Sequence, residues 1–244
     1  MLTQTNIKAE EISSLLSSWL AKKGAVDSYQ WLENKIDDIS QTGGEKALFL
    51  AYSAASRYYG REKLSLPAEE FLALPVAAWN PQNWTLGQIA RSLLLLSFPA
   101  ANSDHYVATL EQIITAADVE EAIAFYQTLP LLPHPEKFQL RAAEGIRTNM
   151  TSVFKAIAHD NSYPAKYLND LAWNQMVLKA LFVGTSLQPI YGLSQRNNPQ
   201  LAQMLVDYAR ERLAAKRTVS AELWELVMPF QPEIVRELQQ FSVK

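Results

Sequence analysis

Three polar residues interrupt a segment, residues 165–183, that is apolar nearly all the way round: Asn174, Gln175 and Lys179. Gln175 and Lys179 are four residues apart, so in a helix they project from one face. A lysine with a lowered pKa in such a place could line a ligand pocket or form a Schiff base. The commoner alternative is structural, because a buried ammonium needs a carboxylate or carbonyl partner and such a pair pins two helices together.

The preceding segment, residues 136–158, carries three more ligand-binding candidates: Glu144, Arg147 and Asn149. Arg147 and Asn149, together with Asn174, could orient an anionic or carbonyl substrate. The alternative is a pair of solvated side chains, since Glu144 and Arg147 are three residues apart and such pairs support a helix surface. Gly145 lies in the middle of this predicted helix, where glycine is less favourable than alanine for helix stability. A glycine at this position therefore indicates close approach of another helix or of a ligand.

The loop between the two segments and the start of the second segment add four supporting candidates: His159, Asn161, Tyr163 and Trp173. His159 falls at the predicted end of a helix, where capping is the commoner role and acid–base work the alternative. The chain has no HExxH spacing and no cysteine, so we expect no metal site. Nucleotide-binding motifs and the GxSxG motif are also absent, and we expect no cofactor. No catalytic residue can be named from these patterns.

Composition excludes several partner classes. The 244 residues are 48% hydrophobic and 19% charged, with a net charge of −3, as in an ordinary globular protein. This charge gives no electrostatic support for nucleic acid as a partner. The strongest apolar run, Ser92 to Phe98, is far shorter than the ~20 residues that span a bilayer. We therefore expect a cytoplasmic protein with no signal peptide and no integral membrane segment.

Apolar residues recur at the helical spacing of three and four along the whole chain, which predicts an all-α fold. We expect eleven or twelve helices in an antiparallel helical bundle or an irregular, HEAT-like α-solenoid. Capping boxes are predicted at Thr42 to Glu45 and at Thr85 to Gln88, and Asp118 to Glu121 is predicted to cap a further helix. A short helix is predicted between Pro67 and Pro75.

Three prolines between Leu129 and Pro135 predict an extended connection. Such a segment could link two domains. Its leucines favour packing against the body of the protein instead, so we predict a single domain over residues 1–244, with a sub-division near residues 130–135 as the alternative.

The segment Arg141 to Phe230 resembles the EboA family. The runs that carry this resemblance are Ala143–Met150 (AEGIRTNM), Tyr163–Tyr167 (YPAKY), Leu171–Gly184 (LAWNQMVLKALFVG), Asn198–Pro199, Met204–Ala209 (MLVDYA) and Glu211–Arg212. The N-terminal part resembles the family only in length and helical character. The resemblance implies a bacterial protein of metabolite traffic, without a defined reaction or catalytic residues. It also implies genes beside a prenyltransferase gene, in clusters that make a secondary metabolite and move it to the cell envelope.

Three hypotheses follow. The leading one is a non-catalytic binding or scaffold protein that holds a small apolar–polar metabolite, or a pathway enzyme, between its two central helical segments. The second is an enzyme of an unrecorded class, with Lys179 and Glu144 as base or nucleophile. The third is an adaptor or homo-oligomer that uses an aromatic surface.

Overall fold

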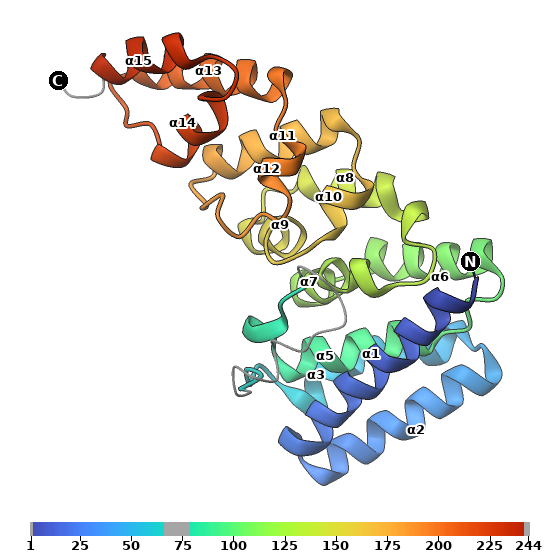
Figure 1. Ribbon diagram of the computed structural model, residues 1–244. Helices are drawn as coiled ribbons and strands as arrows, with labels where there is room; N and C mark the ends of the chain where they lie inside the picture. The colour runs from blue at the N-terminus through green and yellow to red at the C-terminus, as the bar shows by residue number, and fades with distance from the viewer. Residues whose placement is uncertain (1, 66–78, 242–244) are drawn as a thin grey trace. The chain divides into compact units, whose positions relative to one another are not determined.

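The computed structural model describes residues 2–65 and 79–241, and these residues form a helical protein (Figure 1). The predicted all-α class is confirmed. Fourteen α-helices are present in the described ranges, slightly more than the eleven or twelve predicted. The one extended pairing within the described ranges is an isolated antiparallel bridge between Lys63 and Thr85. The short helix predicted between Pro67 and Pro75 lies outside the described residues.

The chain divides into two compact units, Met1–Tyr163 and Pro164–Lys244. The helices of the first unit are α1 (Leu2–Lys23), α2 (Val26–Thr42), α3 (Glu45–Tyr59), α5 (Leu86–Ser97), α6 (Ser103–Ala116), α7 (Val119–Thr128), α8 (Gln139–Ile146) and α9 (Thr151–Ala158). Helix α10 (Tyr163–Tyr167) begins at the boundary. The second unit continues with α11 (Asp170–Phe182), α12 (Leu193–Arg196), α13 (Pro199–Ala214), α14 (Ala221–Val227) and α15 (Pro232–Phe241). The prediction of a single domain stays a prediction.

Helix α5 is the centre of the first unit. It packs against α1, α2, α3 and α7 (Figure 1), and every residue from Leu86 to Leu95 is buried. The helix starts at a capping box in which Thr85 and Gln88 bond each other's backbone amides, as predicted. Its polar residues Gln88, Arg91 and Ser92 are therefore buried together with the apolar ones.

Polar side chains inside the first unit find partners within it. Arg91, 3% exposed, donates from Nε to the Tyr52 carbonyl at 3.1 Å, and its guanidinium lies 5.6 Å from the centre of the Tyr52 ring. The hydroxyls of Ser92 and Thr128 are 2.6 Å apart. Burial raises the pKa of Tyr52 well above its usual value, and its hydroxyl donates to the Glu121 carbonyl. These bonds offset the cost of removing polar groups from water.

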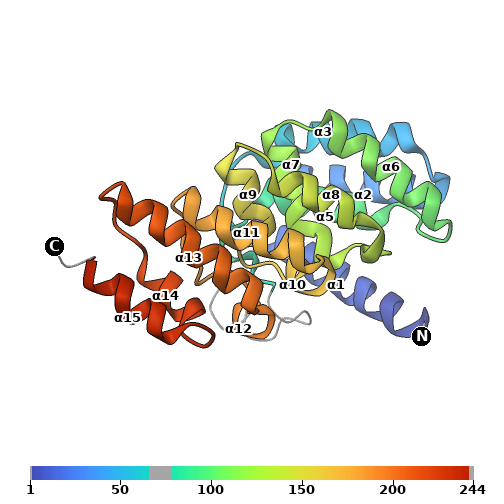
Figure 2. The same cartoon turned by 90° about the horizontal axis from the view of Figure 1, so that it is seen from above.

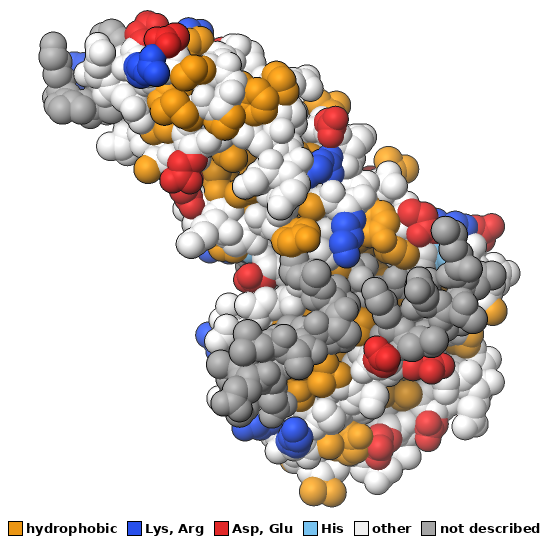
Figure 3. Space-filling model, in the orientation of Figure 1, with side chains coloured by type: hydrophobic (Ala, Val, Ile, Leu, Met, Phe, Trp, Pro, Cys, Tyr) orange, Lys and Arg blue, Asp and Glu red, His pale blue; other side chains and the backbone are white. Residues whose placement is uncertain are grey.

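In the second unit, α13 packs against α11, α14 and α15, and α11 and α13 lie side by side in both ribbon views (Figures 1 and 2). Pro199 occupies the first turn of α13, where its missing N–H costs nothing. The inner face of α13 buries Leu201, Leu205 and Ala209 at the helical spacing. Hydrophobic side chains also reach the surface of this unit, among charged ones (Figure 3).

Both long helical segments predicted around the loop are broken in the structure. The first is divided between α8 and α9 by a turn at residues 147–150, so Met150 is 52% exposed and not part of a buried stripe. The second is divided after α10, because the Asn169 side chain accepts from the Ala172 amide and caps a new helix, α11. Helix α11 is not enclosed: Leu171 and Phe182 are 57% and 76% exposed.

Two local predictions are also wrong and one is confirmed. The segment after Leu129 is not extended but forms 3-10 turns at Leu129–Leu131 and Pro135–Phe138, although its leucines are buried as expected. No capping box forms between Thr42 and Glu45, because Gly43 in the left-handed conformation ends α2 and Gly44 precedes α3. The predicted helix cap at Asp118 is confirmed, and it forms a capping box with Glu121.

Candidate functional site

A groove of about 580 Å³ runs between α11 and α13 in the second unit. One face of each helix lines it. Helix α11 contributes Gln175, Leu178, Lys179 and Phe182, and α13 contributes Met204, Asp207, Tyr208 and Glu211. The two sets have the same spacing, i, i+3, i+4 and i+7, which is one continuous helix face. The volume falls within the range of small-molecule sites.

The groove combines apolar walls with a few polar groups. Leu178, Phe182 and Met204 provide aliphatic and aromatic surface, whereas Lys179 provides a cation. Burial lowers the pKa of Lys179, because removal from water disfavours the charged amine. Gln203 donates to the Asp207 carboxylate at 2.9 Å. Such a groove suits a mainly apolar molecule with one polar end.

Tyr208, which lines the groove, also connects its two helices. Its hydroxyl donates to the Leu181 carbonyl of α11 at 3.1 Å, so one hydrogen bond joins the two helices that form the walls. Arg212, one turn further along α13, places its guanidinium 5.7 Å from the centre of the Tyr208 ring and donates from Nε to the Thr218 carbonyl. The ring therefore has a fixed orientation towards the groove.

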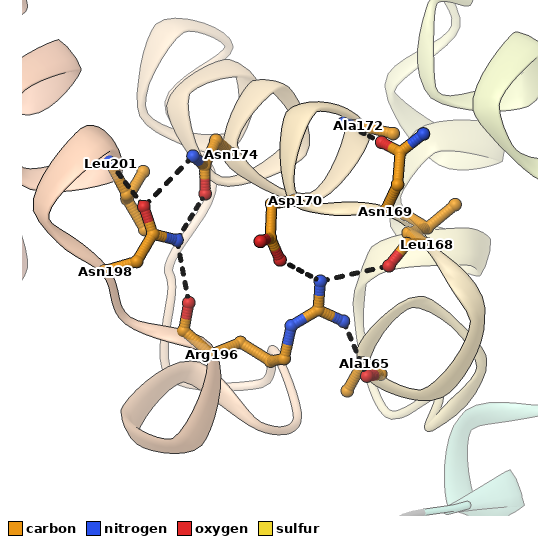
Figure 4. Close-up of polar contacts among 9 residues, drawn as sticks. All are labelled: Ala165, Leu168, Asn169, Asp170, Ala172, Asn174, Arg196, Asn198 and Leu201. Carbon is orange, nitrogen blue, oxygen red and sulfur yellow. Dashed lines mark hydrogen bonds and ion pairs between the residues drawn. The ribbon is translucent and has the colours of Figure 1, made fainter.

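Asn174 of α11 does not line the groove and is fully buried. Its amide exchanges two hydrogen bonds with that of Asn198, at 3.2 and 2.9 Å (Figure 4). Asn198 is also the N-cap of α13, since its Oδ1 accepts from the Leu201 amide at 2.9 Å. The pair thus sets how the start of α13 meets α11, and through this the width of the groove.

Arg196 supports the same region (Figure 4). It donates to the carbonyls of Ala165 and Leu168, and its Nη2 lies 2.9 Å from the Asp170 carboxylate. The guanidinium also lies 5.0 Å from the centre of the buried Trp173 ring. Trp173 is therefore part of the packing beneath α11 and not of the groove lining.

The other three ligand-binding candidates lie in the first unit. Glu144 is exposed, and its carboxylate lies 3.0 Å from Nη1 of Arg141, which also pairs with Glu111. Arg147 and Asn149 are exposed in the turn after α8. Gly145 is a close approach, as predicted, because a Cβ there would lie 2.5 Å from the Tyr126 ring and 2.6 Å from Ile157.

Three residues of the predicted supporting set, also in the first unit, hold the chain after α9. His159 is the C-cap of α9, the position predicted for it. The buried Asn161 amide donates to the carbonyls of Tyr126 and Ala156, and its Oδ1 accepts from the Tyr163 amide at 2.9 Å. The buried Tyr163 donates from its hydroxyl to the Pro135 carbonyl at 2.6 Å. In the described ranges, no group of three or more His, Asp or Glu side chains is placed to hold a metal ion.

Comparison with protein-family models gives a match to the metabolite traffic protein EboA family, over residues 12–228. The chain belongs to the EboA family. This match extends far beyond Arg141 to Phe230, so the N-terminal part belongs to the family region as well. Curated proteins and solved structures gave no match. All eight groove residues fall within the matched region.

The groove wall on α13 was not among the predicted site residues. Met204 and Tyr208 belong to a run that resembles the EboA family, but the pattern alone gives no reason to pair this face with that of Gln175 and Lys179. The shared i, i+3, i+4, i+7 spacing was the available signal. Within the part of the chain that the structure describes, no helix is long and apolar enough to cross a membrane.

Proposed function

We propose that this EboA-family protein is a non-catalytic binding protein that holds a small amphiphilic metabolite in the groove between α11 and α13. The observation that carries this proposal is the groove itself: mainly apolar walls from two facing helices, with the Lys179 ammonium and the Gln175 amide on the α11 wall and the Asp207 and Glu211 carboxylates on the α13 wall. The apolar walls would take a hydrocarbon body, and Lys179 would pair with an anionic or strongly polar end.

The family name supports a role in metabolite traffic. A metabolite traffic protein that binds an apolar intermediate would keep it from water between its synthesis and its passage to the cell envelope. The carrier would act on a secondary metabolite in a bacterial cytoplasm, either alone or by presenting it to a pathway enzyme. Glu144, Arg147 and Asn149 remain candidates for contact with the ligand or with that enzyme.

A fluorescent probe tests binding. The probe is 11-(dansylamino)undecanoic acid, which has an apolar chain and one carboxylate. We expect saturable enhancement of its fluorescence, and an affinity at least about tenfold lower for Phe182→Asp, which removes apolar wall and adds a negative charge. Because Phe182 is 76% exposed, the variant should keep its thermal midpoint.

Leu171→Asp is the matched control. Leu171 lies on the same helix, is also exposed at 57%, and is outside the groove. Its probe affinity should equal that of the wild type. Equal loss of affinity in both variants, or none in either, would remove the groove as the binding site.

A second candidate is an enzyme that forms a Schiff base at Lys179. The lowered pKa of this amine favours it, since only the neutral form attacks a carbonyl. An aldehyde of farnesyl length with borohydride should then add a stable mass to the peptide that contains Lys179, and Lys179→Met should lose it without unfolding. Lys166→Met, an exposed lysine of α10, is the control. Absence of the adduct in the wild type would exclude the Schiff-base enzyme and leave the binding protein as the proposed function.

A further inference from the structure

The first unit contains a second, chemically different cavity of about 300 Å³. It is bounded by α7, by α9 with the residues that follow it, and by the loop around the 3-10 turn η1 (Pro81–Asn83). The backbone N–H of Asn80 donates to the backbone carbonyl of Asp160 at 3.3 Å, and this hydrogen bond holds the loop against the end of α9. The volume equals that of roughly ten waters.

Eight of the eleven residues that line this cavity have polar side chains. They are Asn80, Asn83, Gln127, Ser152, Lys155, His159, Asp160 and Asn161. Ser152 and Lys155 of α9 and its C-cap His159 follow one helix face at i, i+3 and i+7. Amide and hydroxyl groups both donate and accept hydrogen bonds. The charges of Lys155 and Asp160 have opposite sign, so the cavity favours a neutral occupant.

Two groups at this cavity are held at a cost to the fold. Oε1 of Gln127 is buried and accepts no hydrogen bond from the described residues. Asp160 is half-buried with a positive φ of 50°, and burial raises the pKa of its carboxyl group. Both groups are acceptors to which a ligand hydroxyl could donate a hydrogen bond. The Gln127 oxygen could turn towards the ligand, because the terminal torsion of a glutamine amide rotates easily.

The lining also distinguishes between ligand classes. Trp84 is only 3% exposed, so it offers no open ring face on which a nucleobase could stack. A phosphate would meet the single ammonium of Lys155 together with the carboxyl group of Asp160. The apolar residues of the lining are Trp84, Ile123 and Ala156, which could pack against the C–H surface of a sugar ring. A molecule with several hydroxyl groups matches this mixture of donors and acceptors.

We infer that this cavity is a binding site for a neutral polyhydroxylated molecule of monosaccharide size. Gln127 and Asp160 would accept hydrogen bonds from its hydroxyls, and Lys155 and Ser152 would donate to its oxygens. This site is independent of the groove between α11 and α13, since all of its residues belong to the first unit.

The test is a titration of the full chain followed by amide and side-chain NMR, with D-glucose, D-galactose and D-mannose as separate probes up to about 10 mM. We expect saturable shifts of the Asn80, Asn83 and Gln127 side-chain amides with at least one sugar. Adenosine is the competing probe. Saturable shifts with adenosine alone, or with no probe, would overturn the inference.

Gln127→Met separates binding from folding. It removes the acceptor at nearly constant volume, so affinity for the sugar should fall at least about tenfold while the thermal midpoint stays equal or rises, because a buried atom without a donor is removed. Gln112→Met, at an exposed position of α6, is the matched control and should bind as the wild type does. Unchanged affinity in Gln127→Met would contradict the assignment.

Asp160→Asn is the second variant. Asparagine also tolerates a positive φ, so the backbone should be preserved. We expect weaker sugar binding, because the carboxylate is the stronger acceptor. If both variants bind sugar as tightly as the wild type, the cavity is not the site.

Discussion

Helices α5 and α11 are similarly rich in apolar residues but are used in different ways. Helix α5 is covered on every side, and its buried Arg91 and Ser92 bond to groups of the first unit. Helix α11 buries one face, through Asn174 and its neighbours, and leaves Gln175 and Phe182 at the surface. Apolar content therefore indicates that a helix is packed, but not how much of its circumference is covered.

The difference has a functional consequence. A helix that is enclosed on all sides has no face left for a ligand, and its polar groups must be satisfied inside the protein. A helix that is covered on one side can share its other face with a second helix, as α11 does with α13. For this reason we place metabolite binding on α11 and regard α5 as the structural core of the first unit.

The largest expected effect separates these two helices by stability. Leu94→Ala in α5 should lower the free energy of unfolding of the first unit by about 2–5 kcal/mol, because Leu94 is fully buried and the truncation leaves a cavity. Phe182→Ala in α11 should change the stability of the second unit by about 0.5 kcal/mol or less. Denaturant unfolding of both variants checks this. Similar losses would show that α11 is as enclosed as α5.

A smaller effect is expected at the buried amide pair of α11. Asn198→Ala should destabilise the second unit by about 1–2 kcal/mol, since it removes both the cap of α13 and the partner of Asn174. In a double-mutant cycle with Asn174→Ala, the two losses should not add, because the residues share one interaction. Additive losses would mean that the pair does not couple α11 to α13.

The smallest effects concern two carboxyl groups, one in each unit, whose pKa values shift in opposite directions. Burial raises the pKa of Asp160. Burial also opposes ionisation of Glu222, but hydrogen bonds from the Ser186 hydroxyl and from the amides of Leu187 and Gln188 outweigh it and lower its pKa.

The signs of the pH dependence follow from linkage. Charged Asp160 destabilises the first unit above the ordinary aspartate pKa of about 4, so Asp160→Asn should be more stable than the wild type at neutral pH, with the gain vanishing in acid. Glu222 stabilises the second unit above the ordinary glutamate pKa and loses this contribution as pH falls through its lowered pKa. Glu222→Gln should therefore be less stable at neutral pH, and equal in acid. Thermal midpoints of both variants and of the wild type, measured from about pH 3 to about pH 7, check this. At neutral pH the midpoint should be higher than that of the wild type for Asp160→Asn and lower for Glu222→Gln.

Local patterns predicted local features well. The capping boxes at Thr85 and Asp118 formed, because both partners lie within four residues. Gly145 marked a close approach, since glycine is unfavourable inside a helix unless a larger side chain would clash there. The break before α11 was missed, although Asn169 is a strong capping residue, because the apolar spacing continues across it.

Features that depend on distant residues could not be predicted in this way. In the sequence, Asn174 is a polar residue on an apolar helix face. Its hydrogen-bond partner Asn198 lies 24 residues further along the chain, so local spacing does not identify the pair. The groove likewise needs the face of α13, which only the packing of the second unit brings beside Gln175 and Lys179. The helical spacing predicted that Gln175 and Lys179 share one face of a helix. It did not predict which other helix would pack beside that face.

Photo-crosslinking tests the central claim most directly. The probe is a farnesol analogue with a diazirine group, which has an apolar chain and one hydroxyl, and labelled peptides would be mapped by mass spectrometry on the full chain. The account predicts labelling concentrated on residues 175–182 and 204–211, reduced by Phe182→Asp and unchanged by Leu171→Asp. Labelling spread over the surface, or concentrated in the first unit, would contradict metabolite binding by the groove between α11 and α13.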